Sequence, residues 1–148
     1  LKPSNIFLTS ENIVKLGDFG VAKQLQPDVD TAYSVRGTPC YFSPEVCQEF
    51  AYNSKSDIWG LGCLLYELCA LKPAFFSDRK ESLYASIVFG DVKPLPADYG
   101  DEVRHLVALI LSRHPDNRPS AIGLLAEPFV RMHLDRFINL QEILDSCK

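Results

Sequence analysis

The chain has 148 residues, of which 47% are hydrophobic and 23% charged, a composition typical of one globular domain with a hydrophobic core. Fifteen Lys and Arg against nineteen Asp and Glu give a net charge of -4, so a nucleic-acid partner is not expected. The most apolar run, residues 58–71, is interrupted by Glu67 and is shorter than the ~18 residues needed to cross a bilayer, so no membrane partner is expected.

The first forty residues predict a short β-hairpin followed by a long irregular loop. Residues 5–9 and 12–16 are rich in Ile, Val, Phe, Leu and Thr, and the polar pair Ser10 and Glu11 between them indicates a tight turn. Residues 17–41 show no helix or strand period and include three Gly and two Pro. Loops of this length in a compact domain are usually functional or disordered, so this loop points to the working surface.

The remainder of the chain predicts five or six helices around one buried helix. Ser43 and Pro44 are typical of a helix start. Asn53 or Ser54 can cap a helix at about 55–71 that is apolar on nearly all faces and belongs in the middle of a helical layer. The expected helices cover about 44–50, 55–71, 80–89, 102–112, 120–126 and 133–146. The predicted fold class is therefore mainly α.

The cysteines give an indication of the redox environment of the protein. They are odd in number and show no C-x-x-C spacing, so reduced thiols and a reducing compartment are expected. They are Cys40, Cys47, Cys63, Cys69 and Cys147.

Four short motifs occur in a fixed order along the chain. They are Lys2-x-x-Asn5, Asp18-Phe19-Gly20, Gly37-Thr38-Pro39-Cys40-Tyr41 and Ser43-Pro44-Glu45, followed by Asp57-Ile58-Trp59-x-x-Gly62 and Arg118. In this order they resemble the protein kinase signature, from inside the catalytic loop to the end of the C-terminal lobe. The resemblance implies a partial protein kinase domain at residues 1–129 and a C-terminal helical extension at residues 130–148.

Longer runs are similar to the NIMA-related (Nek) branch of the Ser/Thr kinases, namely residues 15–20, 37–45, 55–63 and 71–75. That similarity implies transfer of the γ-phosphate of Mg-ATP to Ser or Thr hydroxyls of protein substrates. It also implies a cytoplasmic location, at the cytoskeleton, centrosome or cilium. A Ser/Thr kinase of another branch and a kinase-like, non-catalytic binding module are the alternatives.

The resemblance assigns nucleotide and metal roles to residues near the N-terminus. Asn5 and Asp18 offer an amide oxygen and a carboxylate, hard ligands that suit Mg²⁺. Lys2 is expected to meet the transferred phosphate and the substrate hydroxyl, and its position three before Asn5 favours Ser/Thr over Tyr substrates. Phe7 is expected to cover the adenine base, or else to be ordinary core in an alternating strand.

Two residues of the loop have expected roles in catalysis or regulation. Thr38 matches the threonine that braces this loop in Ser/Thr kinases. By the same resemblance, Ser34 lies where Nek kinases commonly carry an activating phosphosite. Arg36 and Lys23 are cations nearby in the sequence that could pair with a phosphate there. An unmodified polar loop is the alternative for Ser34.

Three further residues are expected to be structural. Glu45 and Arg118 match a buried ion pair that ties the end of the activation segment to the helical layer. Asp57 matches a carboxylate that accepts hydrogen bonds from the catalytic-loop backbone, and a plain acid at a helix start is the alternative.

The chain begins one residue after the position where the Asp of H-R-D would fall. The glycine-rich loop, the strand lysine and its glutamate partner are also absent, so the 148 residues alone are predicted to be inactive and the missing N-terminal lobe is an expected partner. Retention of Lys2, Asn5, Asp18 and Thr38 favours a fragment of an active kinase over a binding module, because a module that only binds has no need for metal ligands.

The C-terminal segment allows two interpretations. Phe137, Leu140, Leu144 and Cys147 fit a heptad seam for coiled-coil self-association, but they span fewer than two heptads. Docking of Phe137 and Ile138 onto the lobe is the preferred prediction.

Overall fold

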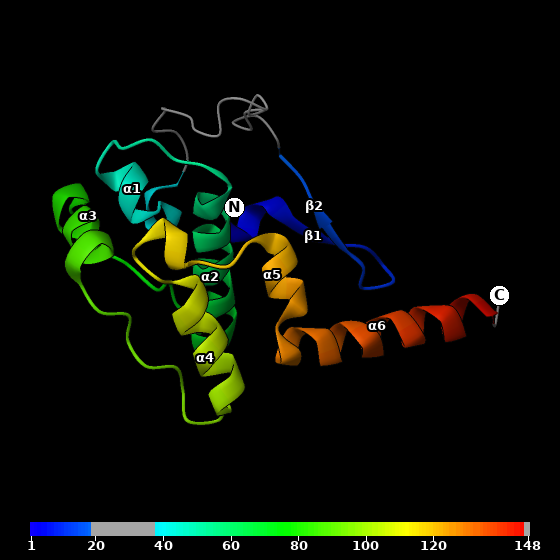
Figure 1. Ribbon diagram of the computed structural model, residues 1–148. Coiled ribbons are helices and arrows are strands. Elements are labelled where there is room, and N and C mark those ends of the chain that lie inside the picture. Colours follow the sequence, from blue (N-terminus) through cyan, green and yellow to red (C-terminus); the bar gives the residue numbers. More distant parts are fainter. Residues whose placement is uncertain (19–37, 147–148) are drawn as a thin grey trace.

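The computed structural model describes residues 1–18 and 38–146, and it confirms the mainly helical class with a small antiparallel hairpin (Figure 1). The elements in chain order are the 3₁₀ turn η1 (Pro3–Asn5), β1 (Ile6–Leu8), β2 (Val14–Leu16), η2 (Pro39–Tyr41), α1 (Pro44–Cys47), α2 (Ser54–Ala70), α3 (Lys80–Phe89), α4 (Asp101–Ile110), η3 (Pro115–Asn117), α5 (Ala121–Ala126) and α6 (Pro128–Ser146). Ser34 and the rest of residues 19–37 lie outside the described residues.

The hairpin forms with the expected tight turn at Ser10 and Glu11, where the Asn12 amide donates to the Thr9 carbonyl at 3.0 Å. Its strands are shorter than expected, and the cross-strand pairs are Ile6–Leu16, Phe7–Lys15 and Leu8–Val14. Asn12 supplies the left-handed backbone after the turn, with a φ of 61°. The Thr9 hydroxyl accepts hydrogen bonds from two later loop amides. Asn tolerates that backbone, and Thr can support a turn with its side chain.

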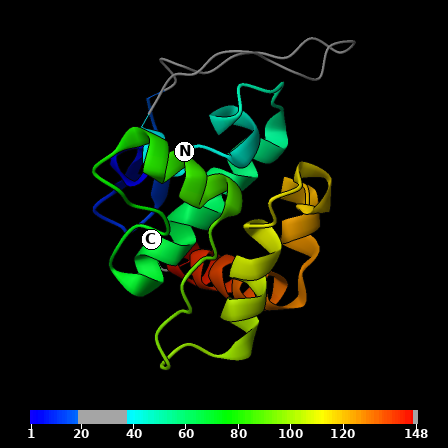
Figure 2. The ribbon, with the colours of Figure 1, turned by 90° about the vertical axis from the view of Figure 1, so that its left-hand side faces the viewer.

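Helix α2 lies at the centre of the helical layer (Figure 2). The Asn53 side chain accepts a hydrogen bond from the Lys55 amide, so Asn53, one of the two expected caps, begins the helix. Its buried residues are Ile58, Trp59, Gly60, Gly62, Cys63, Leu64 and Tyr66. The helix is not buried along its whole length, because Leu68 is 65% exposed near the C-terminal end.

The core has two parts on either side of α2. The larger part joins α2 to α3 and the loops around it, with Trp59 stacked on Phe75 at 5.6 Å between ring centroids. The smaller part joins Ile58 to α4 and α5. A Cβ on Gly62 would lie 2.5 Å from Cγ2 of Ile110, so this glycine permits the close approach of α2 and α4.

Helix α6 begins at Pro128, five residues before the expected start, and runs through the expected domain boundary at 129–130. Its first turn docks on the lobe through Phe129 and Val130. The predicted docking of Phe137 and Ile138 is wrong, because their side chains are 52% and 44% exposed where the helix projects from the lobe (Figure 1).

The remaining residues of the expected heptad seam lie outside the part of the chain whose side chains are described, so coiled-coil self-association stays a prediction. Within residues 1–18 and 38–146, the helices fall short of the length and apolarity that a membrane span requires. The cysteines described there, Cys40, Cys47, Cys63 and Cys69, are free thiols.

Candidate active-site cleft

The hairpin brings Asn5 and Asp18 together at one edge of a cleft. Asn5 closes η1 just before β1, and Asp18 follows β2. The Gly17 amide donates to the Asn5 carbonyl at 2.9 Å, which extends the ladder by one bond, and Asn5 Nδ2 donates to the Asp18 carbonyl at 3.5 Å. Because Nδ2 is the donor, Oδ1 is the atom of Asn5 that can accept from a donor or bind a cation.

Asp18 has a left-handed backbone, with a φ of 58°. A non-glycine residue in this region is uncommon, although Asp and Asn tolerate it better than most. This left-handed residue follows the end of β2 by two positions. Backbone strain of this kind is typical of functional sites.

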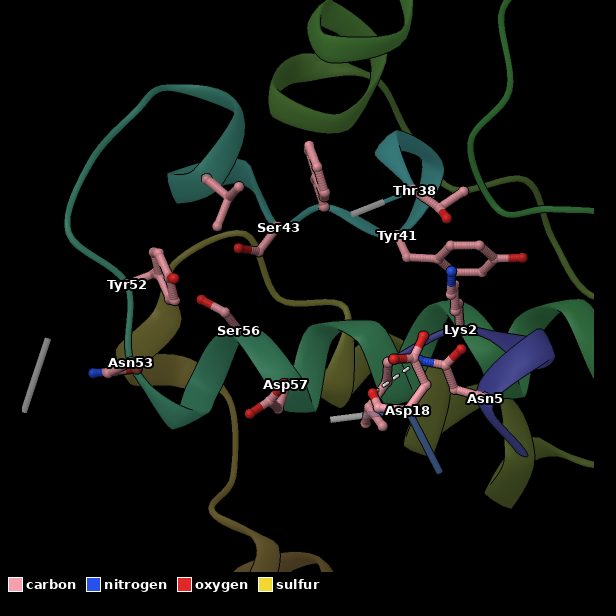
Figure 3. A pocket seen from close by; sticks show the side chains of 13 residues that line it. Lys2, Asn5, Asp18, Thr38, Tyr41, Ser43, Tyr52, Asn53, Ser56 and Asp57 are labelled. Atoms are coloured by element: carbon pink, nitrogen blue, oxygen red, sulfur yellow. Dashed lines mark hydrogen bonds between the residues drawn. The ribbon is translucent and has the colours of Figure 1, made fainter. Parts of the chain in front are cut away.

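The cleft has a volume of about 230 Å³ and is lined by three separate stretches of the chain (Figure 3). The N-terminal stretch contributes Leu1, Lys2, Asn5 and Asp18. The stretch that begins at Thr38 and reaches into α1 contributes Thr38, Tyr41, Phe42, Ser43 and Val46. The start of α2 and the two residues before it contribute Tyr52, Asn53, Ser56 and Asp57. Four expected site residues, Lys2, Asn5, Asp18 and Thr38, therefore share one cavity, with Asp57 on a further wall.

The oxygen donors of Asn5 and Asp18 fit a magnesium ion. Mg²⁺ in nucleotide sites is usually held by one or two protein carboxylates, completed by water and phosphate oxygens. The described residues contain no cluster of three or more His, Cys, Asp or Glu that could form a cage of protein ligands alone. One carboxylate, one amide oxygen and a neighbouring Lys2 suit a metal that arrives with an anionic ligand, rather than a resident structural metal.

One expected site residue lies elsewhere. Phe7 does not line the cleft. Its ring is 54% exposed and lies against Gly17, where a Cβ would approach Phe7 Cε2 to 2.7 Å. Asp57 is exposed in the first turn of α2 and lines the cleft. Its expected bonding to the catalytic-loop backbone stays a prediction.

Glu45 and Arg118 form a buried bidentate ion pair. The two guanidinium nitrogens donate to the two carboxylate oxygens at 2.8 Å each, and the residues are 6% and 1% exposed. The other guanidinium hydrogen bonds go to the backbone carbonyls of Lys55, Ser112 and Arg113 at 2.7 to 3.0 Å. This one side chain therefore joins α1, the start of α2 and the loop after α4.

The surroundings of Glu45 favour its charged form. Burial alone raises the pKa of Glu45, but hydrogen bonds from Arg118 and Ser56 and the Arg118 charge outweigh burial and hold the pKa below its ordinary value. The guanidinium also lies 5.0 Å from the Trp59 ring. An arginine is tolerated inside a core when its planar guanidinium finds acceptors for its hydrogen-bond donors, as it does here.

Sequence reasoning missed a second link between the cleft and α2. The Tyr41 hydroxyl donates to Glu67 Oε2 at 2.7 Å. Burial and this hydrogen bond raise the pKa of Tyr41 above its usual value, so the phenol remains a donor at neutral pH. The signal was present in the sequence, because Glu67 is the carboxylate that interrupts the apolar run 58–71 and needs a partner there.

A small helical lobe with a hairpin and a metal-compatible pair of residues at its cleft has the arrangement of the C-terminal part of a protein kinase domain. The family model for "Protein kinase domain" matches residues 1–130, and the chain belongs to this family.

Within the family the chain is Nek-like. It is 41% identical to mouse "Serine/threonine-protein kinase Nek1", over 98% of this chain and 12% of the mouse protein. It is 44% identical to human "Serine/threonine-protein kinase Nek2", over 88% of this chain and 29% of that protein. It is 46% identical to "G2-specific protein kinase nim-1" of Neurospora crassa, over 89% of this chain and 15% of that protein. The chain thus spans less than a third of each of these relatives.

Proposed function

We propose that this chain is the C-terminal lobe of a Ser/Thr protein kinase, whose whole protein transfers the γ-phosphate of Mg-ATP to hydroxyls of protein substrates. The observation that carries the proposal is the placement of Asn5 and Asp18 side by side at the edge of a cleft that Lys2 and Thr38 also line. The relatives named above support the same reaction, because two are Ser/Thr-protein kinases and the third is a G2-specific protein kinase.

Each cleft residue has a distinct proposed task. Asp18 and Asn5 hold magnesium, which supplies neutralising charge to the nucleotide phosphates when it is bound. The Lys2 ammonium orients the transferred phosphate and the substrate hydroxyl. Thr38 braces the segment that carries the substrate side of the cleft. Phe7, outside the cleft and half-exposed on the hairpin, covers the adenine base from a neighbouring surface.

The partners and location follow from the same proposal. The hairpin carries four exposed apolar side chains, Phe7, Leu8, Val14 and Leu16, which are 49% to 66% exposed. Their natural cover is the N-terminal lobe of the kinase. Ser34 is the proposed activating phosphosite. The proposed location is the cytoplasm, at the cytoskeleton, centrosome or cilium.

The test uses the whole kinase that contains this chain, with Asp18→Asn. Asn has nearly the same size and tolerates the left-handed backbone, so the fold should be retained. Loss of one metal-binding charge removes several kcal/mol of transition-state stabilisation, which should lower kcat/KM by more than about a hundredfold. The assay follows γ-phosphate transfer to a Ser peptide and to its Tyr counterpart.

Asp78→Asn is the matched control, because Asp78 is an exposed aspartate outside the cleft. It should retain full transfer and the same melting temperature as Asp18→Asn. Normal turnover by the Asp18 variant would refute the metal role. Transfer to the Tyr peptide alone would refute the proposed substrate class.

A further inference from the structure

An apolar groove of about 450 Å³ lies between the N-terminal half of α4 and the junction of α5 with α6. Its floor is formed by Leu106, Pro128 and Phe129, of which Leu106 is 8% exposed and belongs to the smaller core cluster. None of its lining residues lines the active-site cleft. In Figure 1 the α4 start and the α5–α6 junction lie at the bottom of the lobe, with the hairpin and α1 above them.

The rim of this groove is negatively charged. Its carboxylates are Asp101, Glu102 and Glu127. Within the described residues none of the three forms an ion pair or a side-chain hydrogen bond, so their charge is directed to solvent and to the groove. His105 is the other titratable residue that lines it.

The cations closest in sequence do not neutralise the rim. The Arg104 guanidinium donates to the carbonyls of Leu95 at 2.8 Å and Pro96 at 2.6 Å. Arg131 pairs with Asp135, one turn further along α6, at 4.0 Å. The groove therefore combines an apolar floor with three carboxylates that have no ion-pair partner, and among the described residues no Lys or Arg lines it.

We propose that this groove binds a peptide segment of a partner protein in which a large apolar side chain is flanked by Lys or Arg. The volume lies within the ordinary range of about 300 to 1,000 Å³ for ligand pockets. Burial of an aliphatic or aromatic side chain on the floor supplies the apolar contact, and cations on either side complement the carboxylates. Nucleic acids and acidic segments are repelled by the same rim.

The groove is a docking site separate from catalysis, so its occupant positions a partner without entering the cleft. One side chain and a few exposed charge pairs give weak, salt-sensitive binding, with a Kd of about 10 to 100 μM.

The probe is a fluorescently labelled hexapeptide with Leu and Phe at its centre and one Lys and one Arg on each side. The 148-residue chain is titrated into this peptide, and binding is followed by fluorescence anisotropy. Binding should be saturable and should weaken as salt rises. Two comparison peptides separate the contributions. One replaces the Leu-Phe centre by two Ser, and the other replaces the basic flanks by Glu. Both should bind at least about tenfold more weakly.

A triple variant locates the site. Asp101→Asn, Glu102→Gln and Glu127→Gln together should raise the Kd about tenfold, since each exposed ion pair contributes up to about fivefold. The matched control changes three acids outside the groove, Glu49→Gln, Asp78→Asn and Glu81→Gln, with the same change in net charge. Its Kd should stay within about twofold of the unmodified chain.

Several outcomes would overturn the proposal. They are equal weakening by both triple variants, equal binding of the Ser-centred peptide, absence of saturable binding, and self-association of the chain that the peptide displaces. The last would mean that a second copy, and not a basic peptide, occupies the groove. None of these results depends on ATP, so failure here leaves the proposed kinase function standing.

Discussion

Arg118→Ala tests how much of the lobe's free energy of unfolding depends on one buried ion pair. The change removes both hydrogen bonds to Glu45 and leaves its carboxylate buried with Ser56 as its remaining side-chain donor. It also leaves the carbonyls of Lys55, Ser112 and Arg113 without this donor. Removal of one partner of a buried pair costs about 3 to 5 kcal/mol, a large share of a domain's total stability.

That cost converts into a large change in thermal stability. For a domain of this size about 1 kcal/mol shifts the melting temperature by roughly 2 to 4 °C, so a decrease of roughly 6 to 20 °C is expected. The assay is a thermal melt of the 148-residue chain followed by circular dichroism at neutral pH. Arg113→Ala is the matched control. Arg113 forms an ion pair with Asp91 at the surface, with 3.8 Å between the guanidinium nitrogen and the carboxylate oxygen, so its loss should change the melting temperature by no more than about 2 °C.

The same pair predicts a pH dependence. The folded-state pKa of Glu45 lies below its ordinary value of 4.5, so the contribution of the pair is complete above about pH 4.5 and is lost as pH falls through the folded-state pKa. In Glu45→Gln the free energy of unfolding should depend less on pH below about pH 4.5 than in the unmodified chain. Equal melting temperatures for Arg118→Ala and the unmodified chain, or the same acid curve for Glu45→Gln, would refute the reasoning.

Two further substitutions test the packing around α2 with the same melt. Tyr41→Phe removes the hydroxyl donor from the half-buried Glu67 and should destabilise the chain by about 1.5 kcal/mol, and an unchanged melt would mean that water replaces the phenol. Gly62→Ala places a methyl group 2.5 Å from Ile110 and should cost about 1 to 3 kcal/mol. Gly123→Ala on α5 is its control, because nothing lies within 3.4 Å of the added carbon and helix propensity favours Ala, so it should be neutral or stabilising. Equal loss in both glycine variants would argue against close packing at residue 62.

Most of the secondary structure could be predicted because local signals are strong here. The expected helix at 80–89 matches α3, Ser120 caps α5, and Asn53 caps α2. The tight turn at Ser10 and Glu11 was confirmed, because the Asn12 amide donates to the Thr9 carbonyl and the Thr9 hydroxyl and the left-handed Asn12 support the turn. The predicted docking of Phe137 and Ile138 was wrong, because both side chains are exposed. A helical spacing of apolar residues predicts that a helix has an apolar face, but it does not identify the element that packs against that face.

The linear order of the motifs that contain Lys2, Asn5, Asp18 and Thr38 was enough to identify the family, and it predicts a nucleotide and metal site at these residues. Their types and spacings are local properties of the chain. Only the tertiary structure placed these four in one cavity, put Phe7 outside it, joined Tyr41 to Glu67, and brought carboxylates of α4 and of the α5–α6 junction to one apolar groove. Such features depend on which distant segments pack together, and packing of that kind is decided by the whole core and not by any one motif.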